Sequence, residues 1–332
     1  MKRKIIKQGH NTLTMTLPRD WVSKLNLNAG DEIDVFERDN SLVVNGHQNS
    51  KEKHAELDIS DFTVPLLWRY FQSMYRAGCD EIKVTFDPKR KKYEDAFHYY
   101  TTQFEYQKLG EKVPPKPAIA MIQEFIDRFV GMEVIESGEG YCIIREMGEI
   151  SKKEFDNSLR RIFLVLLQLF DRVIEAIDRN EIKDSSLCKE IHTIDLNVDK
   201  FVDYCARILN KVVDSVPECK KPLVFSTLFL LELLGDEFKY IGKHLVFSEK
   251  PVKDVLGHAR LVKNHFEMYY QLFYKYDRET AIKFGKNDAL LYATHFKVKN
   301  KVHGETRSIL KHFMMISKFV FALGELRIQM EF

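Results

Sequence analysis

Six long stretches with helical periodicity follow one another after Ser151, and they constrain the fold more than any other feature of the chain. In the second stretch, apolar residues from Ile191 to Val212 recur at alternating spacings of three and four, which is typical of a helix-bundle seam. Pro222, Pro251 and Gly304 stand where stretches begin. We therefore predict an all-helical region over residues 151–332, built as two successive three-helix units at about 151–249 and 251–332.

The first 46 residues have a strand-like pattern instead. Residues 4–8 and 12–17 alternate in period two on either side of a turn at Gly9-His10-Asn11, and Pro18 opens a short helix. A second hairpin follows over residues 32–45, so the predicted order is β-β-α-β-β. So short a segment cannot close a good core alone, and we expect a homodimer to supply the missing half.

Between these two regions, a polar linker at residues 47–54 leads into a mixed segment. The pattern over residues 55–149 predicts a small α/β sandwich in the order β-α-β-α-β-β. A basic, aromatic insertion at residues 87–117 interrupts it, and the helical spacing of Phe97, Tyr100 and Phe104 favours a packed helical arm over a nucleic-acid stacking surface.

Composition narrows the class of protein. The formal net charge of +2 excludes a globally basic coat, although a local basic patch remains open. Five scattered cysteines form no CxxC pair, which indicates reduced thiols in a cytoplasmic protein. The longest apolar run, around Leu223–Leu234, is interrupted by polar residues, so we expect no stable membrane insertion.

Two pairs of carboxylates stand out on the second and third helices of the bundle: Asp195 with Asp199, and Glu232 with Asp236. Counting from the turn of an antiparallel hairpin places Asp199 and Asp236 at one level, so all four groups can converge. Hard oxygen ligands of this kind suit hard metal ions. Alternatively, the pairs lie on a solvated face where Lys200, Lys239 and Lys243 neutralise them.

Two motifs resemble known families. The sequence TLTMTLPRDWVSKLNLNAGDEIDVFERDNSLVV resembles the SpoVT/AbrB (MazE-like) swapped-hairpin DNA-binding domain. LLELLGDEFKYIGKHL resembles the "LERIGDHAxxIA" element of the phosphate-uptake regulator PhoU, and TIDLNVDKFVDYC resembles the other acidic helix of that family. The chain is therefore similar to an archaeal-type fusion of the two families.

The resemblance implies a multidomain α+β fold. Its parts would be an AbrB-like β domain at residues 1–46, the α/β sandwich at 55–149, for which no role is assigned, and a PhoU-like pair of three-helix bundles at 151–332. The resemblance also implies a multinuclear metal site of iron, zinc, manganese or magnesium, held by Asp195, Asp199, Glu232 and Asp236. The second repeat departs from the motif, because Phe321 replaces the first carboxylate and only Glu325 keeps the second.

Charge polarity supports a DNA surface independently of the resemblance. Residues 1–24 hold six Lys or Arg against one acid, whereas residues 25–46 hold one Arg against five acids. The basic edge can meet phosphates, and a dimer would double it. The residues that we expect to contact DNA are Lys2, Arg3, Lys4, Lys7, His10, Arg19 and Lys24.

The leading hypothesis is a non-enzymatic, DNA-binding transcriptional regulator of phosphate uptake, with a helical domain that senses a signal or docks a phosphate-transport or signalling protein. An antitoxin-like DNA-binding module is one alternative, but nearly three hundred further patterned residues argue against it. A carboxylate-bridged metalloenzyme is another. The chain has no Glu-x-x-His pair, phosphate loop, nucleophile elbow or HExxH motif for such chemistry.

Overall fold

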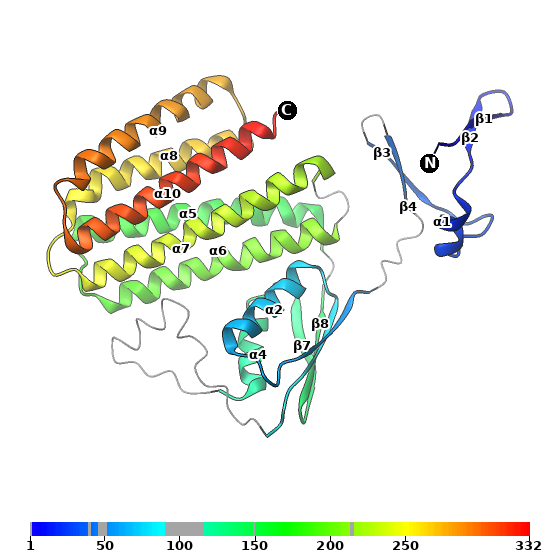
Figure 1. Cartoon of the computed structure of the whole chain (residues 1–332), viewed down its shortest axis with the longest axis horizontal. Coiled ribbons are helices and arrows are strands. Elements are labelled where there is room, and N and C mark those ends of the chain that lie inside the picture. The colour runs from blue at the N-terminus through cyan, green and yellow to red at the C-terminus, as the bar shows by residue number, and fades with distance from the viewer. Residues whose placement is uncertain (1, 39–40, 46–51, 90–115, 149, 213–215) are drawn as a thin grey trace. The chain divides into compact units, whose positions relative to one another are not determined.

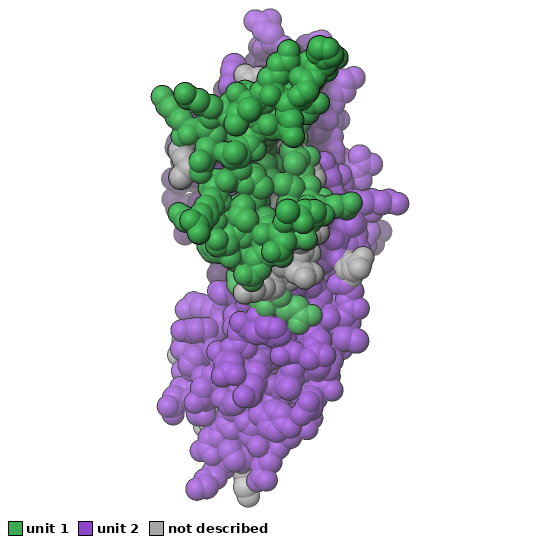
Figure 2. All heavy atoms as spheres, turned by 90° about the vertical axis from the view of Figure 1, so that its right-hand side faces the viewer, with its two compact units in different colours: residues 1–53 green, residues 54–332 purple. Residues whose placement is uncertain are grey.

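The computed structural model describes residues 2–38, 41–45, 52–89, 116–148, 150–212 and 216–332. It divides into two compact units, Met1–Lys53 (unit 1) and His54–Phe332 (unit 2), which are coloured separately in Figure 2. The expected helical arm around Phe97, Tyr100 and Phe104 lies outside the described residues. The multidomain α+β class predicted from the sequence is confirmed, because small sheets precede a long helical region (Figure 1).

Unit 1 has the predicted β-β-α-β-β order. Its elements are β1 (Ile5–Gln8), β2 (Thr12–Met15), α1 (Arg19–Lys24), β3 (Asp34–Arg38) and β4 (Ser41–Asn45). The strands form two separate antiparallel hairpins, β1-β2 and β3-β4. Gly9 in the first turn has a φ of 72°, a left-handed conformation that glycine adopts without a steric penalty.

No described residue of unit 1 is buried within the single chain. Its strands instead expose large apolar side chains, of which Ile5, Leu13 and Leu42 are 68%, 67% and 64% accessible. Helix α1 also has no buried residue. Two hairpins and a short helix therefore lack a hydrophobic core of their own.

Unit 2 begins with a four-stranded sheet in the order β5-β6-β8-β7. Its elements are β5 (His54–Asp58), α2 (Val64–Arg76), β6 (Glu81–Thr85), α4 (Ala118–Ile126), β7 (Met132–Gly138) and β8 (Tyr141–Glu146). Strands β5 and β6 are parallel, and the other pairs are antiparallel. Stacked rings of Trp68, Tyr75 and Phe129 lie in the core of this sandwich.

The helical part of unit 2 matches the predicted two sets of three (Figure 1). The helices are α5 (Lys152–Arg179), α6 (Ser185–Lys211), α7 (Lys221–Phe247), α8 (Leu256–Tyr274), α9 (Arg278–Lys299) and α10 (Gly304–Gln329). A Ser151/Glu154 capping box begins helix α5, and Asn180, with a φ of 58°, is the C-cap residue that follows its last residue, Arg179. Helix α8 begins five residues after Pro251, because Lys253–Val255 first form a 3₁₀ turn.

The sandwich and the bundle share buried polar contacts, which explains why they form one compact unit. The fully buried Arg207 of α6 donates to the backbone oxygens of Tyr75 at 2.8 Å and Cys79 at 2.9 Å. Its Nε also donates to Glu146 of β8 at 3.1 Å. A buried guanidinium is tolerated only when its donors are satisfied in this way.

The described helices include none that is long and apolar enough to cross a membrane.

Candidate functional site

The close approach of α6 and α7 determines the geometry of the predicted carboxylate site. A Cβ atom added at Gly235 would lie 2.5 Å from Asp195 Oδ1 and 3.4 Å from Val198 Cγ1. One added at Gly242, seven residues further along α7, would lie 2.8 Å from Ile191 Cδ1. The glycine in the LLELLGDEF stretch thus makes room for the carboxylate of the neighbouring helix.

The ammonium of Lys239 lies among three of the predicted carboxylates, and we call this group the Lys239 cluster: Lys239, Asp195, Asp199 and Asp236. Lys239 Nζ is 2.7 Å from Asp195 Oδ2 and 2.5 Å from Asp236 Oδ1. Asp195 is fully buried, whereas the side chain of Asp236 is 39% accessible. The cluster is therefore a buried charge network that opens to solvent on one side.

Protonation equilibria in the cluster reflect this burial. Burial raises the pKa of Asp195 to about 6, against the opposing effect of Lys239. Burial and the neighbouring Asp195 raise the pKa of Asp199 well above its ordinary value. For Lys239, burial disfavours the charged form, but Asp195, Asp199 and Asp236 outweigh it and raise the lysine pKa. The cluster thus retains its ammonium, while burial disfavours the ionised form of its aspartates.

The fourth predicted carboxylate, Glu232, belongs to a second ion-pair group centred on Arg76 of α2. Arg76 Nη2 is 2.8 Å from Glu232 Oε2, and Arg76 Nε is 2.5 Å from Oδ1 of the buried Asp203. Burial raises the pKa of Asp203 to about 7, although Arg76 opposes the shift. The sandwich therefore contributes a cation to the acidic face of the bundle.

The sequence pattern does not single out Asp203 or Arg76. Asp203 continues the four-residue spacing of Asp195 and Asp199, so extending that pattern by one step would have included it. Arg76 reaches the site from 127 residues away along the chain and carries no local signal.

As arranged, these residues suit internal cations better than a metal cluster. Within the described ranges, no group of three or more His, Cys, Asp or Glu side chains is placed to hold a metal ion. The Lys239 ammonium occupies the space between Asp195 and Asp236, and the Arg76 guanidinium occupies the space between Asp203 and Glu232. A metal ion would have to displace Lys239.

The second repeat uses its matching glycine for apolar packing. Gly324 of α10 corresponds to Gly235 in the sequence motif, and a Cβ atom there would lie 2.5 Å from Cε1 of Phe284 on α9. The Phe284 ring in turn stacks on the buried His265 of α8 at 4.1 Å. An aromatic ring therefore occupies the position that a carboxylate has in the first repeat.

The basic residues predicted to contact DNA all lie at the surface of unit 1. Lys2, Arg3 and Lys4 precede β1, Lys7 lies within it and His10 lies in the following turn, while Arg19 and Lys24 begin and end α1. All seven residues are exposed. No carboxylate in the described part of the chain forms an ion pair with any of these six cations.

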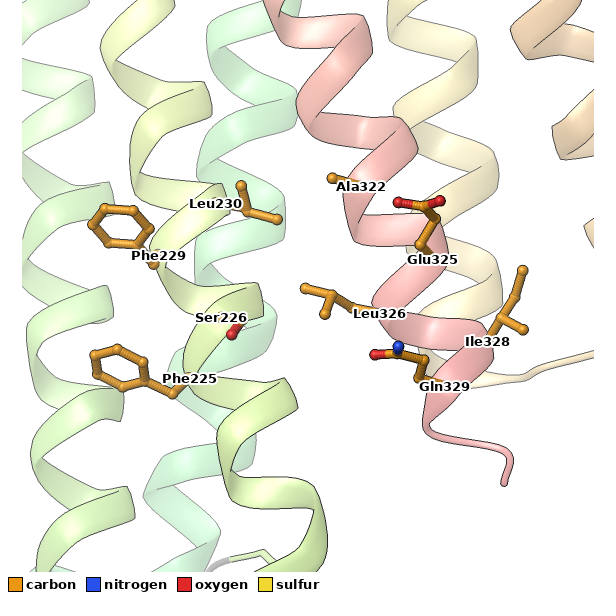
Figure 3. A pocket seen from close by; sticks show the side chains of 9 residues that line it. All are labelled: Phe225, Ser226, Phe229, Leu230, Ala322, Glu325, Leu326, Ile328 and Gln329. Carbon is orange, nitrogen blue, oxygen red and sulfur yellow. The ribbon is translucent and has the colours of Figure 1, made fainter.

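A separate apolar groove of about 590 Å³ lies between α7 and α10. Figure 3 shows Ser226 and Leu230 of α7 opposite Leu326 of α10. Phe225 and Phe229 border the groove and are 45% and 48% accessible.

Comparisons with known proteins gave a family match and a structural match. A family model described as "Antidote-toxin recognition MazE, bacterial antitoxin" matches residues 6–53, in agreement with the resemblance read from the N-terminal motif. The crystal structure of the phosphate transport system regulatory protein PhoU from Streptococcus pneumoniae is similar over 54% of this chain and 94% of that chain, with 15% sequence identity and a TM-score of 0.46. A comparison with curated proteins gave no match.

Proposed function

We propose that this protein is a homodimeric, non-enzymatic DNA-binding regulator of transcription whose unit 2 receives a signal connected with phosphate uptake. The observation that carries the proposal is the combination found in unit 1, where no described residue is buried, the strands expose apolar side chains and the exposed cations pair with no described carboxylate. A segment of this kind needs both a protein partner and an anionic ligand.

A second copy of unit 1 would supply the missing core. Exposed apolar strand residues such as Ile5, Leu13 and Leu42 would become buried when two copies pair their hairpins. Burial of apolar surface contributes about 25 cal/mol per Å² removed from water, so the dimer would be the folded state of this segment. The match to the MazE family model over residues 6–53 supports such an oligomer.

The dimer would present two copies of the basic edge to DNA. Each copy contributes Lys2, Arg3, Lys4, Lys7, His10, Arg19 and Lys24. Cations on strands, turns and a helix start can contact the phosphates, and the short side chains near the first turn can approach the bases. Counterion release would make the affinity strongly dependent on salt.

The phosphate connection rests on the LLELLGDEFKYIGKHL motif, which resembles that of phosphate-uptake regulators. In unit 2 this motif brings α7 against α6 through Gly235 and places the Lys239 cluster at their interface. We infer that unit 2 senses a signal or docks a phosphate-transport or signalling protein, and that unit 1 converts the signal into DNA binding in the cytoplasm.

Genome-wide capture of DNA with the full-length protein, at high and low phosphate, tests the proposal. We expect enrichment of promoters of phosphate-uptake genes, with occupancy that changes between the two conditions. If the protein occupies discrete sites equally at high and low phosphate, the phosphate connection is wrong but DNA binding stands. Absence of any enriched site would overturn DNA regulation itself.

A multinuclear site of iron, zinc, manganese or magnesium is a separate proposal, supported by the motif resemblance of Asp195, Asp199, Glu232 and Asp236. It requires Lys239 to move aside, because its ammonium now lies between Asp195 and Asp236. Metal analysis of the purified protein and of the Asp199→Ala/Asp236→Ala variant tests it. Equal, negligible metal in the two proteins would rule it out.

The description of the matching family model favours one further function, that of an antitoxin. An antitoxin would form a stable complex with a toxin. Co-expression with toxins encoded near the gene would then yield a complex that survives purification and neutralises the toxin. A regulator of phosphate uptake would not protect cells from any of them.

A further inference from the structure

A cavity of about 470 Å³ opens between α9 and α10, near the end of the bundle where one helix leads into the other. Its cationic lining consists of Lys299, Arg307, Lys311 and Lys318, and His295 lies beside them. Leu310, Met314 and Met315 supply an apolar floor. No acidic side chain in the described part of the chain lines this cavity, which we call the cationic pocket.

The pocket arises because α10 separates its charges between two faces. On the face toward α7, Glu305 contacts His244 at 2.5 Å, and His312 contacts Glu237 of α7 at 2.6 Å. Arg307, Lys311 and Lys318 are spaced at four and seven residues, so they share one stripe of the helix. The carboxylates of this region are therefore engaged elsewhere, and the cations gather at the pocket.

These four cations have no paired carboxylate among the described residues. In the described parts of unit 2, no ion pair joins Lys299, Arg307, Lys311 or Lys318 to a carboxylate. Burial lowers the pKa of His295, and the nearby Lys299 and Lys318 lower it further. Like charges held around one cavity repel each other, and an anionic ligand would relieve the repulsion.

We propose that the cationic pocket binds a small phosphorylated ligand of the nucleotide class. Arg307, Lys311 and Lys318 would contact the phosphates, since guanidinium and ammonium groups form charge-assisted hydrogen bonds to them. The organic part would pack on Leu310, Met314 and Met315, because a flexible methionine surface adapts to planar groups. The volume lies within the range of small-molecule sites. This inference is independent of DNA binding, which we assign to unit 1.

Isothermal titration calorimetry of the full-length protein with ATP and with inorganic phosphate tests the proposal. We expect saturable binding of ATP and binding of inorganic phosphate weaker by about tenfold or more, because phosphate lacks the apolar contacts. The Arg307→Met/Lys311→Met variant keeps the aliphatic volume but removes two charges, and it should bind ATP at least about tenfold more weakly. Lys286→Met, on an exposed part of α9 outside the pocket, should bind as the parent does.

A Met314→Glu variant separates the two halves of the site, since it adds a negative charge to the apolar floor and should abolish ATP binding. Thermal melting of each variant shows whether it folds. If the double variant does not fold, the single variant Lys311→Met takes its place in the titration. Two outcomes would overturn the proposal. One is the absence of saturable ATP binding to the parent, and the other is equal ATP affinity in the parent and the charge variant.

Discussion

Gly235 and Asp195 lie so close that a Cβ atom on the glycine would be 2.5 Å from Oδ1 of the aspartate. The glycine of the leucine-rich stretch thus leaves room for a buried carboxylate on the neighbouring helix α6. Lys239, one turn further along α7, pairs with the same carboxylate at 2.7 Å. Helix spacing and charge compensation at this interface therefore depend on one another.

Replacing Gly235 with alanine should lower the free energy of unfolding by about 1–3 kcal/mol, the usual effect of overpacking a close contact. Gly285→Ala is the matched control, because a Cβ at this α9 position meets no atom within 4 Å. Alanine there should raise stability by up to about 1 kcal/mol through its higher helix propensity. Urea denaturation measures both, and equal stabilities of the two variants would contradict the Gly235–Asp195 contact.

Removing the Lys239 ammonium should destabilise the protein in a pH-dependent manner. Lys239→Met leaves Asp195 buried without its cation, and breaking such a pair costs about 3–5 kcal/mol when the remaining group stays charged. The folded-state pKa of Asp195 is already raised to about 6, above its ordinary value of 3.8, and loss of the lysine raises it further. The variant should therefore be much less stable than the parent at pH 8. The difference in unfolding free energy should shrink toward pH 5, because Asp195 becomes protonated in the folded variant.

Urea titrations at pH 5 and pH 8 check this prediction. The double variant Lys239→Met/Asp195→Asn removes the buried charge and should recover part of the stability at pH 8. Lys286→Met, an exposed lysine on α9, serves as the control. A deficit that is the same at both pH values would mean that Asp195 does not carry the effect.

Acid should destabilise the second repeat through His265. This fully buried histidine stacks on Phe284, and burial lowers its pKa from 6.5 to about 4. Because the folded-state pKa is depressed, its contribution to stability is complete above pH 6.5 and is lost as the pH falls toward 4, by up to about 3 kcal/mol. His265→Leu should flatten the decline in unfolding free energy over this range. His10→Leu, in the exposed turn of unit 1, should not, and parallel pH profiles for parent and His265→Leu would refute the assignment.

Dimer formation should depend on the exposed apolar strands of unit 1. Leu13→Asp introduces a charge at a side chain that is 67% accessible in the single chain, so it harms stability only if a partner buries it. Sedimentation velocity should show a dimer for the parent and a monomer for the variant. Leu290→Asp, at a 50% accessible position on α9, should leave the dimer intact. A parent that sediments as a monomer would contradict the prediction.

Sequence patterns located most of the fold because the local signals are strong. The 3-4 spacing from Ile191 to Val212 and the breaks at Pro222 and Gly304 predicted helix bounds close to those of α6, α7 and α10. Counting along an antiparallel hairpin placed Asp199 level with Asp236, whereas in the structure Lys239 joins Asp236 to Asp195, one turn earlier on α6.

Long-range partners could not be predicted in the same way. Arg76 joins the acidic face only because α2 packs on α6, a contact between segments far apart in the chain. The cationic pocket likewise forms only when α9 and α10 place Lys299 beside Arg307 and Lys318. Side chains such as these have no local periodicity that separates them from an ordinary solvated face.

The salt dependence of DNA affinity shows whether unit 1 is the DNA-binding surface. We predict that the parent binds promoter DNA with a steep decline of log K against log salt, and that Arg3→Ala/Lys4→Ala/Arg19→Ala binds at least about tenfold more weakly. The slope should become shallower by up to about 0.9 for each DNA phosphate that the variant no longer neutralises. Lys253→Ala/Lys286→Ala/Lys301→Ala removes three exposed charges from unit 2 and should change neither value. Equal affinities and equal slopes for the parent and the unit 1 variant would contradict the assignment of unit 1 as the DNA-binding surface.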